Sequence, residues 1–284
     1  MKKLITAAVV ALTFAGTAVA DPIYIDVGVD NGGNANDAAG PTTTGWKDLL
    51  QLKYSSNSDV TDVNMNGIID AGDTIISSGG LIPGASLSSN LVTALVADQF
   101  GGGPSDNGFK AAGAWGLSFR FDDLMGTFNG TDFIYTSGKI EWLLMLDPTN
   151  DQSFSQEVHL FDMNVAGHSS MPGNQNYFGE IGNFGVGQVN GVDIGDIFNV
   201  QVGGASVGFE EYAANYAQNV RFNINQNTVT RPSDFSYNGQ TGKFEIRGAS
   251  HNAELTFSVP EPASIAMLGL GLLGFAGASR RKSK

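Results

Sequence analysis

The chain has 284 residues, of which 28 are acidic and 15 are basic, so its formal net charge at pH 7 is −13. Between Asp21 and Ser258 there are 27 acidic residues and 9 basic ones, a formal charge of −18. This argues against nucleic acid or an anionic membrane surface as a partner, because phosphate binding needs clustered lysine and arginine. Cysteine is absent, which excludes thiol chemistry and disulfides and makes the fold depend on its core, with or without a metal.

The first twenty residues have the three parts of a secretory signal peptide. Two lysines form the basic start, residues 4–14 form the apolar stretch, and small residues end at Ala18 and Ala20. The apolar stretch is too short to remain as a membrane span. We therefore predict export with cleavage after Ala20, which leaves Asp21 as the first mature residue.

The mature part, residues 21–258, is predicted to form one extracellular all-β domain. Apolar residues alternate over 23–29 and 50–54, which indicates half-buried strands. Only Ser88 to Gln99 has the spacing of an amphipathic helix, with a serine cap before it and Gly101 after it.

From Trp115 onward the pattern returns to short strands separated by turns. We expect strands over residues 115–121, 131–138, 139–147, 155–165, 195–203, 219–229, 242–248 and 253–259. Many short strands at this spacing are typical of an antiparallel β-sandwich or jelly roll. The predicted fold is therefore an all-β sandwich with one short helix.

The segment from Asp62 to Asp73 matches a twelve-residue calcium loop at its informative positions. Oxygen-bearing side chains stand at positions 1, 3, 5, 9 and 12, glycine stands at position 6, and the residue at position 7 offers its backbone carbonyl. The predicted metal ligands are Asp62, Asn64, Asn66, Ile68, Asp70 and Asp73. Only three of the six carry a carboxylate, which predicts weak structural Ca²⁺ binding, on the order of 10⁻⁴–10⁻³ M. The alternative is an Asn/Gly/Asp turn that binds nothing.

No catalytic residues are predicted. His159 is expected at an outward strand position, His168 in a loop and His251 in a turn, and none has the spacing of a zinc ligand. Acidic pairs, namely Asp122 with Asp123, Glu210 with Glu211 and Asp193 with Asp196, meet the minimal need of a glycan hydrolase. Such pairs also arise by chance in a chain this acidic, so hydrolysis remains a distant alternative.

The tryptophans leave open a second alternative, a calcium-dependent carbohydrate-binding module. Trp46, Trp115 and Trp142 are candidate stacking platforms for sugar rings. Trp142 lies in a largely apolar segment, which favours core packing, and Trp46 follows a polar loop, which makes it the better candidate.

The last twenty-six residues, 259–284, begin with Pro260, Glu261 and Pro262, continue as an uncharged run and end in a basic cluster. The run of sixteen residues spans about 24 Å as a helix, short of the ~30 Å hydrocarbon core. The tail therefore predicts a short transmembrane helix that contacts the inner membrane transiently.

These residues resemble the PEP-CTERM sorting signal of Gram-negative bacteria. The resemblance implies that exosortase recognises Pro260, Glu261 and Pro262 and processes the tail, so that the protein reaches the cell surface or extracellular matrix. Segments 24–34, 73–80 and 221–229 also resemble flocculation-associated PEP-CTERM proteins. That likeness implies a structural or adhesive role in extracellular polysaccharide, cell aggregation and biofilm.

Overall fold

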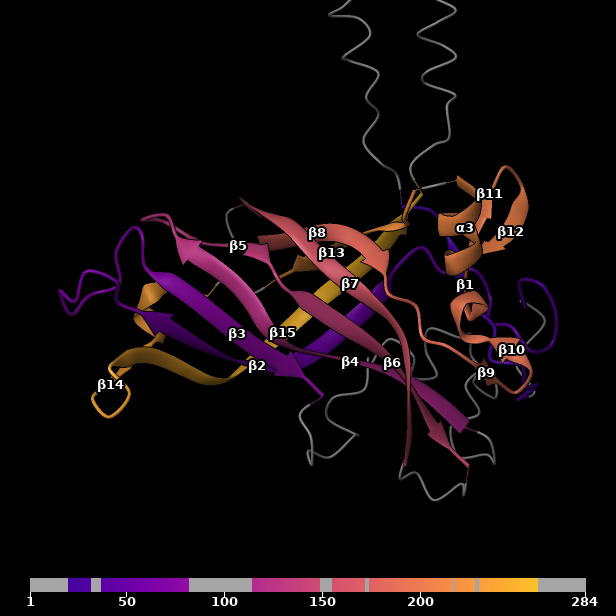
Figure 1. The fold of residues 1–284 in the computed structure, drawn as a ribbon, viewed down its shortest axis with the longest axis horizontal. Helices are drawn as coiled ribbons and strands as arrows, with labels where there is room; N and C mark the ends of the chain where they lie inside the picture. The colour runs from indigo at the N-terminus through magenta and orange to yellow at the C-terminus, as the bar shows by residue number, and fades with distance from the viewer. Residues whose placement is uncertain are drawn as a thin grey trace, which may run out of the picture.

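A computed structural model describes residues 20–31, 37–81, 114–148, 155–171, 174–216, 218–227 and 230–259. Within these ranges, ten strands form a single antiparallel sheet (Figure 1). They are β2 (Leu50–Thr61), β3 (Thr74–Gly80), β4 (Ala114–Phe128), β5 (Phe133–Ser137), β6 (Lys139–Asp147), β7 (Gln156–Met171), β8 (Asn174–Gly182), β13 (Arg221–Gln226), β14 (Ser236–Asn238) and β15 (Lys243–Ser258).

The sheet closes on itself through β13. Residues Arg221–Gln226 pair on one side with β8 and on the other side with the second half of β15. The resulting ring runs β13-β8-β7-β6-β4-β3-β2-β15 and returns to β13, with β5 attached to β4 and β14 attached to β15. We call this ring the closed sheet. Its barrel-like form leaves every ring strand with a partner on both sides, which removes free edges.

The all-β prediction is confirmed, but the closed sheet differs from the predicted sandwich or jelly roll of two packed sheets. One reason lies in β15, which was expected as two strands with a turn at His251. It is instead a single sixteen-residue strand with an irregularity between Ile246 and Ala249. This bulge lets one strand follow β2 over most of its length and still reach β13.

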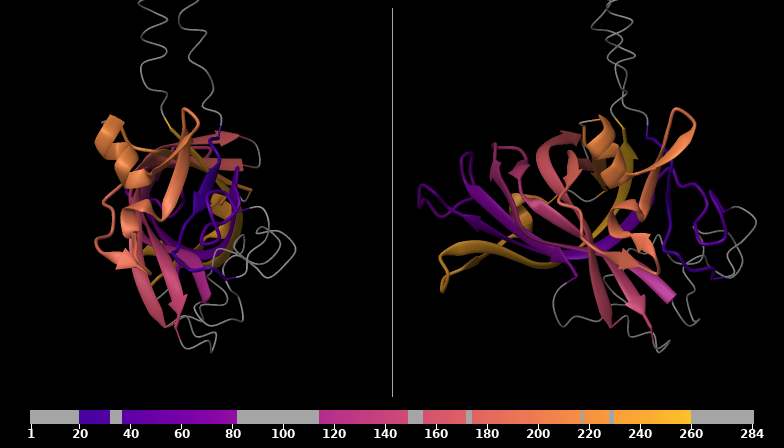
Figure 2. Two further views of the ribbon diagram at one scale, coloured as in Figure 1. Left: turned by 90° about the vertical axis from the view of Figure 1, so that its right-hand side faces the viewer. Right: turned by 45° about the vertical axis from the view of Figure 1, so that its right-hand side comes forward.

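A smaller set of elements covers one end of the closed sheet, at the right of Figure 1. It contains the three-stranded sheet of β1 (Ile23–Ile25), β11 (Phe198–Val202) and β12 (Ala205–Gly208), the pair β9 (Gln188–Val189) and β10 (Val192–Asp193), and helix α3 (Phe209–Tyr216). Two short 3₁₀ turns, η2 (Ile194–Asp196) and η3 (Pro232–Asp234), complete the described elements. We call this set the cap; it faces the viewer in the left view of Figure 2 and is seen obliquely in the right view.

Aromatic side chains join the cap to the closed sheet. Phe198 of β11 meets Phe161 of β7 edge to face, with ring centroids 5.1 Å apart. Phe209 of α3 meets Phe257 of β15 at 5.3 Å. Such pairs add to the large apolar area that each ring buries. The cap is therefore part of the same core as the closed sheet.

The inward face of the closed sheet follows the two-residue period of a strand. In β2, buried and more exposed residues alternate from Leu50 to Thr61, as the sequence predicts for Leu50, Leu52 and Tyr54. In β1 the prediction is only half right, because Tyr24 is buried along with Ile23 and Ile25. Ile23 and Ile25 pack in the main core and Tyr24 packs on Trp46, so alternation is lost there.

Two predicted helices fall on residues that the structure does not describe. These are the helix at Ser88–Gln99 and the transmembrane helix within 259–284, of which only Val259 is described. Among the described residues, no helix is long and apolar enough to cross a membrane. Helix α3 was not predicted; its buried residues are Phe209 and Tyr212.

Candidate functional site

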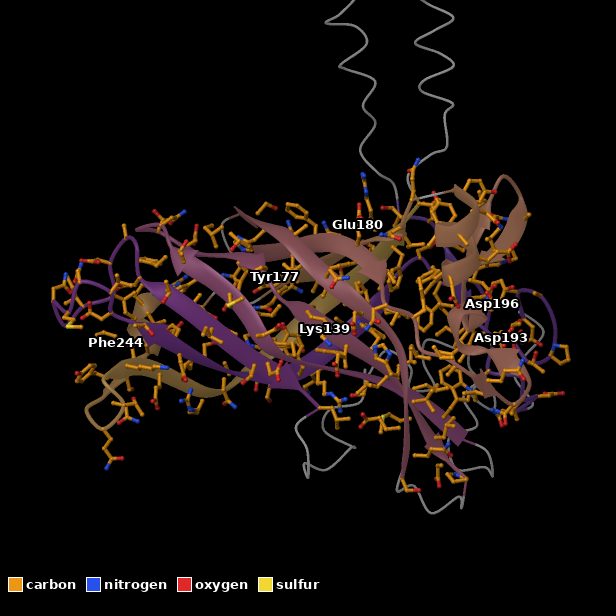
Figure 3. The ribbon with its side chains drawn as sticks, in the orientation of Figure 1. Lys139, Tyr177, Glu180, Asp193, Asp196 and Phe244 are labelled. Atoms are coloured by element: carbon orange, nitrogen blue, oxygen red, sulfur yellow. The ribbon has the colours of Figure 1, made fainter. Side chains whose placement is uncertain are left out.

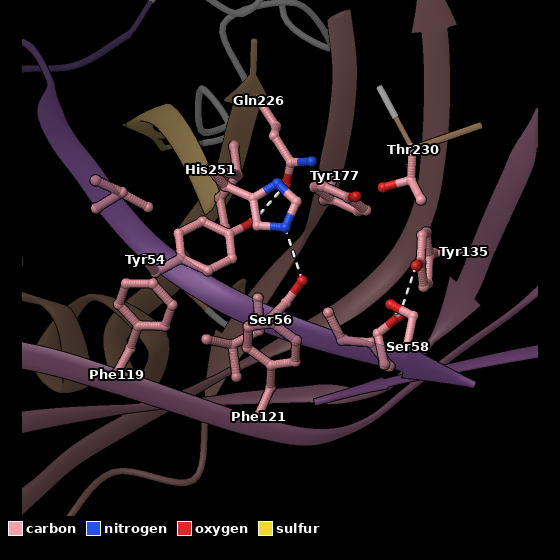
Figure 4. Close-up of a pocket in the computed structure, with 15 residues that line it drawn as sticks. Tyr54, Ser56, Ser58, Phe119, Phe121, Tyr135, Tyr177, Gln226, Thr230 and His251 are labelled. Atoms are coloured by element: carbon pink, nitrogen blue, oxygen red, sulfur yellow. Dashed lines mark hydrogen bonds between the residues drawn. The ribbon is translucent and has the colours of Figure 1, made fainter. Parts of the chain in front are cut away.

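The inside of the closed sheet contains an unusual concentration of polar side chains. Tyr54, Ser56 and Ser58 come from β2, and His251 faces them from the adjacent strand β15 (Figure 4). Neighbouring strands add the remaining members, which are Ser77, Tyr135, Gln175, Tyr177 and Gln226. We call these nine residues the interior polar cluster; each is less than a tenth exposed.

Hydrogen bonds link the interior polar cluster in two groups. In the first, Ser56 Oγ lies 2.7 Å from His251 Nε2, and the Tyr54 hydroxyl donates to the side-chain oxygen of Gln226. Gln175 extends this group, since its side-chain oxygen accepts from the Gln226 side-chain amide at 3.5 Å and from the Tyr177 hydroxyl at 3.0 Å. These bonds offset the cost of burying hydroxyl, amide and imidazole groups away from water.

The second group runs across three strands. Ser58 and Ser77 hydroxyls lie 2.7 Å apart, and Ser77 is also 2.7 Å from the Tyr135 hydroxyl. Burial raises the pKa of Tyr135, and it raises the pKa of Tyr54 and Tyr177 further, with like-charge repulsion from the neighbouring tyrosines as a smaller cause. All three phenols are therefore neutral hydrogen-bonding groups at physiological pH.

Among the titratable groups of the cluster, His251 is the one whose pKa burial shifts within the acidic to neutral range. Its ring lies 4.9 Å from the ring of Tyr54, and it is 4 % exposed. Burial lowers the pKa of His251 to about 4, because the imidazolium would lose its hydration. His251 Nδ1 and Gln175 Nε2 have no hydrogen-bond partner among the described residues.

A small cavity of about 30 Å³ lies within the interior polar cluster, lined also by Phe119 and Thr230 (Figure 4). That volume is large enough for one buried water molecule, which two to four polar groups would have to bind. Ser56 and His251 have the spacing of a nucleophile and its base. The cavity beside them has no room for a substrate larger than water.

The predicted calcium loop connects β2 to β3 and brings its acidic residues together. Asp62 accepts hydrogen bonds from the backbone N–H of Asn66 and Gly67, at 3.3 and 2.7 Å. Asp73 accepts from the backbone N–H of Val63 and of Asp70, both at 2.9 Å. Gly67 has a φ of +81°, which glycine adopts without strain.

The carboxylate of Asp70 is bound by side-chain amides of the same loop, which affects metal binding. It accepts from the amide nitrogens of Asn64 and Asn66, at 3.0 and 2.6 Å. These amide donors therefore stabilise the negative charge of the Asp70 carboxylate, as a bound cation would otherwise do. Of the other predicted positions, Ile68 is 59 % exposed at the loop tip. Ile69 packs against the core.

The oxygen-rich donor set fits a hard cation such as Ca²⁺. Within the described ranges, however, no group of three or more His, Cys, Asp or Glu side chains is arranged so that it could hold a metal ion. Binding at this loop would require the Asn64 and Asn66 amides to turn their oxygens inward.

The other histidines are both in β7, which corrects the prediction that His168 lies in a loop. His159 contacts Asp162 at 2.9 Å on the outer side of the closed sheet. His168 lies against the ring of Tyr177 at 5.5 Å. Burial lowers the pKa of His168. The Gly/Ser/Pro composition after His168 obscured a strand that continues to Met171.

Two of the three tryptophans are buried in the core. Trp115 is 1 % and Trp142 0 % exposed, as predicted for Trp142. Trp46 is 37 % exposed and packs edge to face on Tyr24 at 4.9 Å. Trp46 is therefore the one tryptophan in the described chain with a face open to solvent.

The acidic pairs lie in different parts of the fold. Asp193 and Asp196 belong to the cap (Figure 3), near Glu210 and Glu211 at the start of α3. Partial burial raises the pKa of Asp196, with repulsion from Glu211, Asp193 and Glu210 as further causes. Asp122 and Asp123 lie instead on β4, where β3 has a register irregularity.

A polar groove crosses the outer face of the closed sheet near Asp122. One part of about 280 Å³ is lined by Asn57, Ser78, Arg120, Asp122, Lys139 and Glu141, among others, and a second part of about 260 Å³ shares Asn57, Ser78 and Asp122. Arg120 and Lys139 each contact Glu141 at 2.7 Å (Lys139 is labelled in Figure 3). The hydrogen bond from Lys139 is the main cause that lowers the pKa of Glu141.

The two ends of the described chain meet. The backbone N–H of Asp21 donates to the carbonyl of Phe257 at 2.8 Å. The backbone N–H of Val259 donates to the Asp21 carboxylate at 2.7 Å. Ala20 is described beside this contact, whereas Ala18, Pro260, Glu261 and Pro262 lie outside the described residues.

Comparison with known proteins identifies a sorting motif at the C-terminal end of the chain. The family model of the PEP-CTERM protein-sorting motif matches residues 258–282. No curated protein and no solved structure gives a significant match to the chain. The match confirms the sorting signal expected from Pro260, Glu261 and Pro262. It supports a PEP-CTERM exosortase substrate that is exported to the cell envelope or surface.

The buried His251 predicts a loss of stability in mild acid. Its pKa is about 4 in the folded chain and about 6.5 when unfolded, so between these values the unfolded chain binds more protons. The stabilising contribution is complete above pH 6.5 and falls by about 3 kcal/mol as the pH drops to 4. We expect His251→Gln to flatten this dependence, measured by urea unfolding of the purified protein between pH 7.5 and 4.

His159→Gln provides the matched control, because His159 lies on the outer side of the closed sheet. It removes one histidine and leaves the interior polar cluster intact. Equal slopes for wild type and His251→Gln would contradict a neutral buried imidazole.

Proposed function

We propose that the protein is a surface or matrix component with a structural or adhesive role in extracellular polysaccharide and cell aggregation. The sorting motif at residues 258–282 is the observation that carries this proposal, because it places the chain among exported proteins that exosortase handles. The charge of −18 over residues 21–258 supports it, since such a surface stays soluble and can be bridged by divalent cations.

The closed sheet suits a structural role. Its ring strands offer no free edge for unspecific strand addition, and its interior leaves no cavity for a substrate among the described residues. We therefore propose that the chain acts through its outer surface and is not an enzyme.

The role in aggregation predicts a phenotype. Deleting the gene should reduce cell aggregation and the polysaccharide retained on cells, measured by settling rate and by assay of washed cells. Wild-type protein should restore both. A chain with alanine at Pro260, Glu261 and Pro262 should restore neither, because the domain would be made but not sorted. A deletion strain that aggregates normally would contradict this role.

We also propose that the loop Asp62–Asp73 binds Ca²⁺ weakly and that the ion is structural. The support is the hydrogen-bonded turn that carries Asp62, Asp70 and Asp73 in the connection between two paired strands. An ion here would replace amide donors with a full charge and hold β2 against β3.

Calcium should therefore stabilise the purified protein at millimolar concentration. With a Kd of about 1 mM, 10 mM Ca²⁺ adds about 1.4 kcal/mol and raises Tm by about 3–6 °C. Asp70→Asn should abolish the shift, while Asp48→Asn, at an exposed position outside the loop, should retain it. Absence of heat in a calorimetric titration together with an unchanged Tm would rule out the site.

The second candidate function is carbohydrate binding, and the polar groove is the observation that favours it. Asn57, Ser78 and Asp122 join its two parts and present both donors and acceptors, as a sugar hydroxyl requires. Its bases are paired with acids at Arg120, Lys139 and Glu141. This balance favours a neutral or amino-bearing glycan over an anionic one.

Carbohydrate binding predicts retention of the purified protein on the native matrix polysaccharide. Asp122→Ala should weaken retention several-fold without lowering Tm, because Asp122 is exposed and lines both parts of the groove. Asp48→Ala is the matched control and should bind as wild type does. Loss of retention on chelation would show that the calcium loop contributes. Retention that Asp122→Ala leaves unchanged would exclude this groove.

A further inference from the structure

The meeting of the two chain ends has a direct bearing on sorting. Val259 is the last described residue and directly precedes Pro260. Its backbone N–H is held by the Asp21 carboxylate at 2.7 Å, and its side chain packs against the main core. A hydrogen bond to a charged acceptor at this length belongs to the stronger class. Val259 is therefore fixed from both its backbone and its side chain.

The proline that follows restricts Val259 further. A residue before proline is confined to extended conformations by its contact with the proline ring. Asp21 thus binds the residue whose backbone is already stiff. Pro260, the first residue of the Pro260–Pro262 triplet, comes directly after this anchor, so no linker in the sequence separates the triplet from Val259.

Asp21 can make these contacts in both forms of the chain. Its backbone nitrogen donates to the Phe257 carbonyl at 2.8 Å, as an amide before cleavage and as an ammonium group after cleavage at the predicted site. Its carboxylate is unchanged by that cleavage. The contact with Val259 can therefore persist when the chain is processed at its start.

The surface around this contact is open. A groove of about 590 Å³ on the outer face is lined by Ala20, Phe178, Arg221, Thr256 and Ser258, among others. Ser258 is also the first residue of the matched sorting motif. One side of the strand end before the motif therefore borders this groove, while Phe257 on the same strand packs against the cap.

We propose that Asp21 is a positioning residue for exosortase processing: by holding Val259 it fixes the point from which the Pro260–Pro262 motif leaves the domain. The proposal rests on the exosortase processing that the sorting motif supports. It assigns to the first residue of the mature chain a role in an event at the opposite end of the sequence.

The test compares removal of the tail in the native host by pulse-chase labelling and mass spectrometry of the C-terminus. Asp21→Ala should slow tail removal about fivefold, within the range that one charge-assisted hydrogen bond supports. Asp21→Asn keeps an oxygen acceptor for the Val259 N–H and should restore the rate to within about twofold. Cleavage of the signal peptide is measured in the same samples and should be unchanged in both variants.

A second variant separates positioning from stability. Inserting Gly-Ser-Gly-Ser between Val259 and Pro260 keeps every contact of Asp21 but adds slack before the motif. We expect the same slowing of tail removal, with the Tm of the full chain in detergent unchanged. A wild-type rate for either the insertion or Asp21→Ala would overturn the proposal, as would faster tail removal in either.

A control identifies failure of the premise. Alanine substitution of Pro260, Glu261 and Pro262 should abolish tail removal if exosortase reads this motif. If the tail is still removed, the processing assumption fails independently of Asp21. If it is not removed, the rates of the Asp21 and insertion variants decide the role of Asp21.

Discussion

The pairing of β13 with β15 is the contact on which the rest of the structure depends. Six consecutive residue pairs, from Arg221 with Ser258 to Gln226 with Ala253, join β13 to the end of the sixteen-residue β15 and complete the ring. Without it, β13 and the second half of β15 would be free edges. Because the same half of β15 ends at the sorting motif, closure of the sheet also fixes where the chain leaves the domain. Strand β15 therefore both closes the sheet and leads into the sorting motif.

Closure at eight strands also explains the interior. A ring of about this size has an inside just wide enough for side chains to fill, and the inward faces here are filled by apolar residues at the capped end and by the interior polar cluster beyond them. Most of the polar residues pair across strands, as in the contact of Ser56 with His251, while His251 Nδ1 and Gln175 Nε2 have no partner among the described residues. Buried networks of this kind rigidify a core when their members are paired. The cavity between them is water-sized, so the interior is filled almost completely by side chains.

The sequence predicts local features here better than long-range ones. Alternation identifies β2 correctly, and the composition of residues 139–147 matches β6 residue for residue. The segment around His251 was misread, because Gly248, Ser250 and Asn252 are typical turn residues and only pairing with β2 shows that they continue a strand. The sequence does not predict strand β8 for a similar reason. Asn and Gly make up four of its nine residues, and its burial comes from β7 and β13 on either side. The closure itself joins residues distant in sequence, and no local pattern encodes it.

The candidate sites divide in the same way. The predicted calcium loop can be recognised in the sequence because its candidate ligands lie within twelve consecutive residues, and the structure holds their three carboxylates in one hydrogen-bonded turn. The interior polar cluster and the contact of Asp21 with Val259 cannot be recognised in the sequence, because they depend on residues far apart in it: Ser56 and His251 are 195 positions apart, and Asp21 and Val259 are 238 apart. Asp21 illustrates the consequence: in the sequence it is only the residue after a predicted cleavage site, and in the fold it holds the start of the sorting motif. Because Asp21 and Val259 lie at the two ends of the described domain, their contact brings both of these ends to a single point.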